Sequence, residues 1–357
     1  EWDGLIWTQR QREGPAFSLG HTASYDRLRD VVIMYNGGEY SDVTWQWDGR
    51  EWTVLDRDGP SPLYNPKMAY DELRGVTVMF GISTDDHWQF WSETWEWNGT
   101  VWSKRTDEAP PARERHAMTF DSDNGVTVLF GGWDQSAGRL NDLWTWDGSN
   151  WRLISTDGPQ PRVAHAIAYD RSRGRVVLFG GEATDGSALG DTWEWDGSNW
   201  SLRGIDGPPP RREHAMIYDE ERGVTVLFGG LDASWQTLDD TWEWDGNVWS
   251  PRFGSGPGER YGHVMVYDTD RRAVLLHGGS PYAYAGNIWE LGRHELAPDI
   301  DEDCDVDLLD LSAFQTCFGT DLRLGHCERF DADSTGDITL ADFEAFQRKL
   351  SGPSPPD

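Results

Sequence analysis

The sequence predicts an all-β fold, a six-bladed β-propeller, followed by a small α-helical domain at the C-terminal end. Three observations lead to this prediction: a motif of about fifty residues occurs six times, each copy divides into four short strands, and the composition changes abruptly after residue 295. A period of this length is typical of stacked or radial units that are each too small to bury their own apolar face.

The copy that begins at His165 shows the expected strands most clearly. Residues 165–170 alternate between apolar and polar side chains, and residues 175–179 form a β-branched and aromatic run that ends at a Gly-Gly doublet. After a variable loop, residues 191–195 alternate large aromatic with polar side chains, and an Asp-Gly turn leads into a fourth strand at 199–203. Four antiparallel strands per unit, repeated radially, describe a propeller blade.

The spacing between copies is regular, and the linkers between them are rich in proline. Four histidines recur at intervals of 49 residues, namely His116, His165, His214 and His263. The linker at 206–211 reads Asp-Gly-Pro-Pro-Pro-Arg, and such a segment cannot continue a strand ladder. We therefore expect each linker to separate two blades.

Two units depart from the pattern. In the second, Pro66 stands where the other copies place His and Ile82 replaces the second glycine, which we interpret as a degenerate blade. The last unit stops without a fourth strand, whereas the chain begins inside a Trp-Asp-Gly-x-x-Trp phrase at residues 2–7. We expect residues 5–9 to supply the missing outer strand, because ring closure removes two open sheet edges.

The copies share an Arg-x-x-His entry, a Tyr-Asp turn, a Gly-Gly doublet and a Trp after Asp-Thr. This combination resembles the kelch repeat from residue 1 to about 292. It implies a kelch-type propeller over residues 1–296, closed by the N-terminal strand.

The residues after 296 carry two acidic loops with the spacing of an EF-hand. Positions 1, 3, 5, 7, 9 and 12 of the first loop are Asp299, Asp301, Asp303, Asp305, Asp307 and Asp310. The same positions of the second loop are Asp331, Asp333, Thr335, Asp337, Thr339 and Asp342. Both loops precede a predicted helix, at 311–318 and 343–350, so this region is expected to bind two calcium ions.

Loop then helix, duplicated and with Asp at position 12, resembles the dockerin domain of secreted bacterial proteins. The resemblance implies a dockerin-like domain over residues 297–350, a flexible tail at 351–357, and a protein partner such as a cohesin-like receptor or a neighbouring chain. Cys304 takes position 6 of the first loop, where glycine is usual, so we expect that calcium site to be strained and the weaker one.

The net charge and the cysteine content limit the kinds of partner and the cellular location that we expect for this protein. The formal net charge of −31 disfavours nucleic acid and anionic membranes as partners, and no apolar run approaches the length of a membrane helix. The three cysteines allow three pairings, of which we prefer Cys317–Cys327 because it leaves both calcium loops unstrained. A disulfide together with calcium indicates an extracellular or cell-surface location, and we expect that a segment before Glu1 was removed.

The propeller face that carries the loops after Gly-Gly offers candidate ligand contacts. Aromatic side chains in these loops suit stacking on a sugar ring or another amphipathic ligand. They are Tyr40, Trp88, Trp91, Trp133, Trp235, Tyr282 and Tyr284. The Arg and His of each Arg-x-x-His entry should lie on the same face, where the repetition of His at equivalent positions favours a structural role.

No catalytic residues are predicted. The sequence shows no nucleophile–base constellation, phosphate loop or zinc spacing, and the propeller lacks the Cys that a radical-copper oxidase requires. Acidic residues occur in the same loops, without a pairing that indicates catalysis: Asp85, Asp86, Asp134, Asp185, Asp232 and Glu182. We therefore predict a secreted binding or assembly protein, with a dockerin-tagged extracellular carbohydrate-active enzyme (hydrolase, lyase or sugar epimerase) as the alternative.

Overall fold

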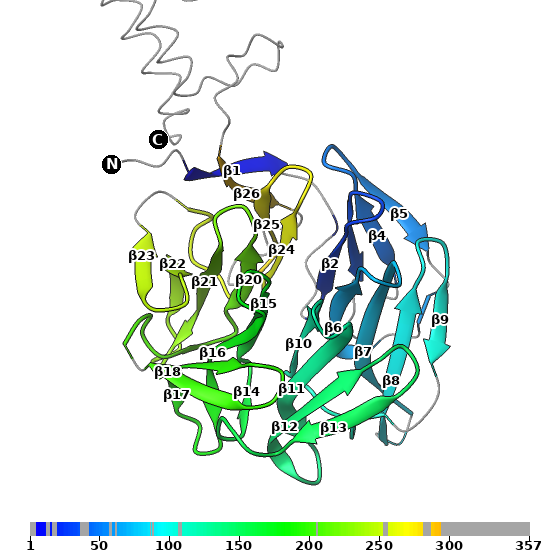
Figure 1. Ribbon diagram of the computed structural model, residues 1–357. Coiled ribbons are helices and arrows are strands. Elements are labelled where there is room, and N and C mark those ends of the chain that lie inside the picture. Colours follow the sequence, from blue (N-terminus) through cyan, green and yellow to red (C-terminus); the bar gives the residue numbers. More distant parts are fainter. Residues whose placement is uncertain are drawn as a thin grey trace, which may run out of the picture. The chain divides into compact units, whose positions relative to one another are not determined.

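A computed structural model shows how the repeats are arranged (Figure 1). It describes residues 5–11, 15, 20–35, 43–56, 59–60, 63–85, 87, 89–105, 109–204, 206–252, 256–280 and 287–293. The predicted domain at 297–350 and the tail at 351–357 lie outside these residues, so the calcium loops and the Cys317–Cys327 disulfide remain predictions.

The described residues form six antiparallel sheets, one for each repeat. Blade 1 contains β2 (Thr22–Asp26), β3 (Val31–Tyr35), β4 (Thr44–Trp47) and β5 (Trp52–Asp56). Blade 2 contains β6 (Tyr64–Asp71), β7 (Val76–Thr84), β8 (Phe90–Trp97) and β9 (Trp102–Arg105). Blade 3 contains β10 (Ala117–Asp121), β11 (Val126–Asp134), β12 (Gly138–Trp146) and β13 (Trp151–Ser155).

The remaining three blades complete the ring. Blade 4 contains β14 (Arg162–Val163), β15 (Ala166–Asp170), β16 (Arg175–Ala183), β17 (Ala188–Trp195) and β18 (Trp200–Gly204). Blade 5 contains β19 (Arg211–Arg212), β20 (Ala215–Asp219), β21 (Val224–Asp232), β22 (Thr237–Trp244) and β23 (Trp249–Arg252). Blade 6 contains β24 (Val264–Asp268), β25 (Ala273–His277), β26 (Ile288–Arg293) and β1 (Leu5–Gln11).

The N-terminal strand closes the ring as the sequence predicts, because β1 pairs with β26 (Figure 1). Trp7 on β1 packs edge-on against Phe228 of blade 5, with ring centroids 5.5 Å apart, and its Nε1 donates to Thr241 Oγ1 at 3.2 Å. Trp249 makes the same two contacts one blade earlier, with Phe179 at 5.3 Å and Thr192 at 2.8 Å. The closing strand therefore repeats the packing of an internal outer strand.

The hydrophobic core lies between neighbouring blades. At the junction of blades 3 and 4, for example, Phe130 and Leu143 pack with Leu178 and Trp195, all of them buried. The second strand of each blade is buried on both faces, which explains its continuous apolar sequence. Each blade thus completes the core of the next one.

The Gly-Gly doublet creates a bulge where the second strand leaves the core. The β11–β12 register shifts between Phe130 and Gly132, and both glycines have positive φ, 62° and 105°. A Cβ on Gly131 would lie 3.0 Å from the Arg162 carbonyl oxygen of blade 4, so glycine is needed for close approach. Blade 2 lacks the second glycine, its β7–β8 ladder has no shift, and the irregularity appears instead in β6.

One detail of the prediction is corrected. Blades 4 and 5 each have five strands, because the end of the proline-rich linker forms a two-residue strand, β14 or β19. Arg162 pairs with Ala183, and Val163 pairs with Glu182. The linker pairs with the second strand of the blade only after its prolines. The sequence pattern alone does not reveal this pairing.

Candidate functional site

The entry segments of the blades and the hairpins after Gly-Gly lie on one face of the propeller. Arg162 and Val163 pair directly with the end of β16, and Glu114 forms an isolated bridge with Trp133 at the end of β11. The Arg-x-x-His entries and the Gly-Gly hairpins therefore line the same mouth of the central channel, as the sequence predicts. We call this surface the hairpin face.

The arginine of each Arg-x-x-His entry is structural in blades 3 to 5. The Arg162 side chain is fully buried, makes two hydrogen bonds to Asp191, and donates to the Gly180 carbonyl oxygen at 2.9 Å. Equivalent contacts join Arg113 to Asp142 and Arg211 to Asp240. These arginines tie the linker to the bulge and are not available to a ligand.

The repeated histidines are buried between blades. His165 packs edge-on against Phe130 of the preceding blade at 5.4 Å, and His214 packs against Phe179 at 5.6 Å. Burial is the main reason why the pKa of His214 falls to about 3, with the nearby Arg211 guanidinium acting in the same direction. The imidazoles thus act as neutral packing groups, in agreement with the structural role that repetition suggests.

The two residues between Arg and His vary from blade to blade and surround the channel mouth. The residue before His, or before Pro66 in blade 2, has positive φ at Asn65, Arg115, Ala164 and Glu213. Backbone hydrogen bonds link consecutive blades here, from Ala164 N to Arg115 O and from Glu213 N to Ala164 O, both 2.9 Å. A rigid backbone therefore presents side chains that the repeat does not specify.

Charged side chains meet across this mouth. Arg115 of blade 3 pairs with Glu213 of blade 5 at 3.3 Å. Lys67 lies close enough to Glu213 for an electrostatic interaction, at a position that is small or apolar in the other blades. Burial lowers the pKa of Lys67, and the Glu213 carboxylate opposes this effect.

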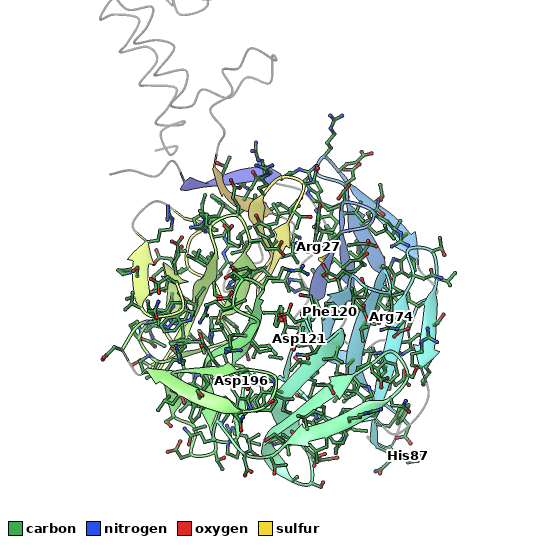
Figure 2. The ribbon with its side chains drawn as sticks, viewed as in Figure 1. Arg27, Arg74, His87, Phe120, Asp121 and Asp196 are labelled. Atoms are coloured by element: carbon green, nitrogen blue, oxygen red, sulfur yellow. The ribbon has the colours of Figure 1, made fainter. Side chains whose placement is uncertain are left out.

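Four charged side chains bridge the opposite end of the channel, where the Tyr-Asp turns lie. Arg27 pairs with Glu72 at 2.8 Å and with Glu220, while Arg171 pairs with Glu220 at 3.2 Å and with Glu72. Figure 2 shows Arg27 toward the middle of the ring. These residues line a cavity of about 190 Å³, and their four ion pairs join blades 1, 2, 4 and 5.

A second cavity, of about 160 Å³, opens on the hairpin face between blades 2 and 3. It combines apolar, aromatic and carboxylate groups. Its lining consists of Ile82, Phe90, Ala112, Glu114, Trp133, Asp134, Gln135 and Ser136. Its volume is below the range of roughly 300–1,000 Å³ usual for drug-sized ligands, so it suits one side chain or one ring.

The two carboxyl groups in this cavity differ. Burial raises the pKa of Glu114, and the neighbouring Arg115 offsets only part of this rise. Burial also raises the pKa of Asp134, but hydrogen bonds from Ser136 and Ala137 outweigh it, so this pKa is lowered overall. Glu114 accepts one long hydrogen bond, from Asn65 Nδ2 at 3.4 Å.

Of the aromatic residues predicted as ligand contacts, the structure describes three, and all three are exposed. Trp133 lines the blade 2–3 cavity and is 39% exposed. Trp91 lies on β8, where its Nε1 donates to Glu93 Oε1 at 2.7 Å. Trp235 lies on blade 5 with its ring 3.9 Å from the Arg212 guanidinium carbon. Tyr40, Trp88, Tyr282 and Tyr284 lie outside the described residues, as does the acidic candidate Asp86.

The acidic residues of the hairpins are mostly turn caps. Asp134 Oδ1 accepts from Ser136 N at 2.8 Å and Ala137 N at 2.6 Å, and Asp232 Oδ1 accepts from Ser234 N at 2.7 Å and Gln236 N at 2.8 Å. Asp85 and Asp185 cap their hairpins in the same way. Glu182 differs, because it pairs with both Arg139 and Arg212.

Glu114 was missed in the sequence analysis. It lies between the repeated Arg113 and His116, at a position that the repeat does not conserve between blades, so the repeated pattern does not mark it. The sequence feature that could have identified Glu114 is the variability of its position in the repeat, since the equivalent residues are Val163, Arg212 and Tyr261.

Comparison with known proteins agrees with the fold. The KLHDC2/KLHL20/DRC7 Kelch-repeats domain family matches residues 147–292. The structure of YjhT has a TM-score of 0.63 at 16% sequence identity, and the similarity covers 78% of this chain and 95% of that chain. The crystal structure of a nidogen/laminin complex has a TM-score of 0.42 at 12% identity, over 61% of this chain and 79% of that chain. No curated protein matches the chain.

The protein therefore folds as a six-bladed β-propeller whose residues 147–292 match a kelch-repeat family, and kelch propellers commonly mediate protein interactions. At 16% identity the likeness to YjhT shows the fold alone. In the part of the chain that the structure describes, no helix is long and apolar enough to cross a membrane. The same residues contain no group of three or more His, Cys, Asp or Glu side chains placed to hold a metal ion.

Proposed function

We propose that this protein is a binding module whose hairpin face receives a ligand in the cavity between blades 2 and 3. The observation that carries this proposal is the meeting of Trp133 and Glu114 in one cavity. Both occupy positions that the repeat leaves variable, and two backbone hydrogen bonds join the two residues within blade 3. Such a concave site with an aromatic wall and few polar groups is typical of ligand pockets.

Binding to peptide and glycan arrays, followed by calorimetry on the best ligands, tests this proposal. Trp133→Ala should weaken binding at least about tenfold, the loss of one buried aromatic contact. Leu153→Ala is the control, because it removes an exposed apolar side chain outside the cavity. Equal affinity of Trp133→Ala and the unmodified protein would overturn the assignment.

The second part of the proposal concerns residues 297–350. We propose that they bind two calcium ions and dock the propeller to a protein partner, either a cohesin-like receptor or a neighbouring chain, outside the cytosol. The support is the double loop-and-helix pattern in the sequence. A chelator should remove helical circular dichroism from the full chain while the propeller unfolds at an unchanged temperature; an unchanged helical signal contradicts calcium binding.

A carbohydrate-active enzyme is the second candidate, and one observation favours it. Glu114 and Asp134 line the same cavity, and their pKa values are shifted in opposite directions, as in an acid and nucleophile pair. Binding is the better supported function, because Asp134 Oδ1 is occupied by its own turn. If the protein hydrolyses aryl glycosides from a test panel and Glu114→Gln abolishes this activity, the enzyme becomes the better supported function.

A further inference from the structure

We propose that the blade 2–3 cavity recognises an organic cation, specifically the guanidinium group of an arginine side chain on a basic peptide. This inference rests on the proposed binding function and names its ligand class.

Glu114 has no cationic partner among the described residues. Three arginines lie close to it in the sequence or in the ladder, and each pairs elsewhere. Arg113 binds Asp142, and Arg115 reaches across the mouth to Glu213. Arg139, the ladder partner of Trp133, turns to Glu182 and to the Thr184 carbonyl oxygen. A partly buried carboxylate without a counter-ion is costly, and a ligand cation would relieve that cost.

The same face shows how this protein holds a guanidinium group. On blade 5, the buried Arg212 lies under the ring of Trp235 at 3.9 Å and pairs with Glu182 of blade 4. Tryptophan and glutamate thus bind the two sides of one arginine through stacking and charge. The blade 2–3 cavity has the tryptophan and the glutamate but no arginine between them.

Size and charge narrow the ligand further. A volume of about 160 Å³ accommodates a single side chain. The lining contains no Lys, Arg or His, so it offers no positive charge to a carboxylate or phosphate ligand. The net charge of −31 raises the local concentration of cationic peptides near the protein. A neutral sugar could stack on Trp133, but it would leave the Glu114 charge unpaired.

Ligand-observed NMR with two small probes tests the inference on the full chain. N-acetyl-arginine amide should bind at least about tenfold more tightly than N-acetyl-citrulline amide, which has the same shape and no charge. Glu114→Gln should remove this preference, and Trp133→Ala should weaken both probes. Trp235→Ala is not used here because it disturbs Arg212. Leu153→Ala, an exposed apolar position on an outer strand, serves as the control and should change neither affinity.

The results of these measurements distinguish a failure of the cation assignment from a failure of the proposed binding function. Equal binding of the two probes, or a preference for arginine that survives Glu114→Gln, overturns the cation assignment; the latter would indicate attraction to the acidic surface in general. If a neutral peptide or glycan binds and Trp133→Ala abolishes that binding, the binding function stands and the cation class is wrong. If nothing binds in a manner sensitive to Trp133, both proposals fail.

Discussion

Arg162 and Asp191 are joined by two parallel hydrogen bonds, Nη1 to Oδ1 and Nη2 to Oδ2, each 2.8 Å long, although the arginine side chain is fully buried. Blades 3 and 5 contain the same bidentate pair. The arginine also holds the bulge carbonyl of Gly180, so one side chain fixes the linker, the bulge and the third strand together. This polar contact, repeated in three blades of the hairpin face, is therefore part of the scaffold.

Removal of this arginine should destabilise the fold strongly. Arg162→Ala leaves the carboxylate of Asp191 without its cationic partner, and we expect a loss of about 3–5 kcal/mol in the free energy of unfolding. The control is Arg152→Ala, which removes a largely exposed pair with Asp147 at 3.6 Å and should cost less than about 1 kcal/mol. Urea unfolding measures both, and similar losses for the two variants would contradict a scaffold role.

Trp7 should be as important as an internal outer-strand tryptophan, because it makes the same contacts. Trp7→Ala is expected to lower the free energy of unfolding by about 3–5 kcal/mol. Trp249→Ala, which removes the equivalent contacts with Phe179 and Thr192, should cost a similar amount. Chemical unfolding of both variants compares them directly. If Trp7→Ala costs little while Trp249→Ala costs several kcal/mol, the N-terminal strand does not close the ring in solution.

Threonines on the third strands anchor the tryptophan of the following blade, and Thr225 on the second strand β21 offers a buried hydroxyl without a partner for comparison. Thr192→Val keeps the shape but leaves Trp249 Nε1 buried without an acceptor, so we expect a loss of about 1–3 kcal/mol. Thr225 is equally buried, and its hydroxyl has no partner, so Thr225→Val should be neutral or stabilising. Thermal unfolding distinguishes the two, and a larger loss for Thr225→Val would refute the assignment.

The same contact shows why local departures from the repeat matter. Leu143 occupies the threonine position of blade 3, and Trp200 Nε1, which would donate to it, is buried without a partner. Ile288 occupies that position in blade 6, and Trp52 Nε1 is likewise unsatisfied. Single copies of a repeat lose a hydrogen bond where the partner blade lacks the acceptor.

The fold of the repeat region could be predicted from the sequence because periodicity specifies it six times. The repeated strands, the degenerate blade at Pro66 and the closure by residues near Trp7 all follow from position within the repeat. The five-stranded form of blades 4 and 5 could not be predicted, since pairing of Arg162 with Ala183 depends on where the linker runs after its prolines.

The candidate site was predicted in part. The sequence placed Trp133 on the hairpin face, but the cavity depends on how far side chains of blades 2 and 3 reach toward each other. Glu114 could not be singled out, because its lack of a counter-ion arises from Arg115 and Arg139 turning to Glu213 and Glu182. These two ion pairs depend on the spacing between blades, which the sequence pattern does not show.

The buried histidines predict a loss of stability at acidic pH. The pKa of His214 is lowered from 6.5 to about 3, mainly by burial and also by the Arg211 guanidinium, and burial similarly lowers the pKa of His277 to about 3. In the unfolded chain these side chains regain a pKa near 6.5, so between pH 6.5 and about 3 the unfolded state binds more protons. The free energy of unfolding should therefore fall as the pH falls through this window, by up to about 1.4 kcal/mol per pH unit for each histidine, and these groups should add no pH dependence above it.

Urea unfolding at a series of pH values measures this slope. His214→Gln places a neutral group at the site, so the variant should lose up to about 1.4 kcal/mol per pH unit of the slope below pH 6.5, whatever its stability at neutral pH. His87→Gln changes a histidine whose side chain is 86% exposed on a hairpin and controls for the substitution itself. A His214→Gln variant that keeps the full slope of the unmodified protein would show that this imidazole is not held neutral between the blades.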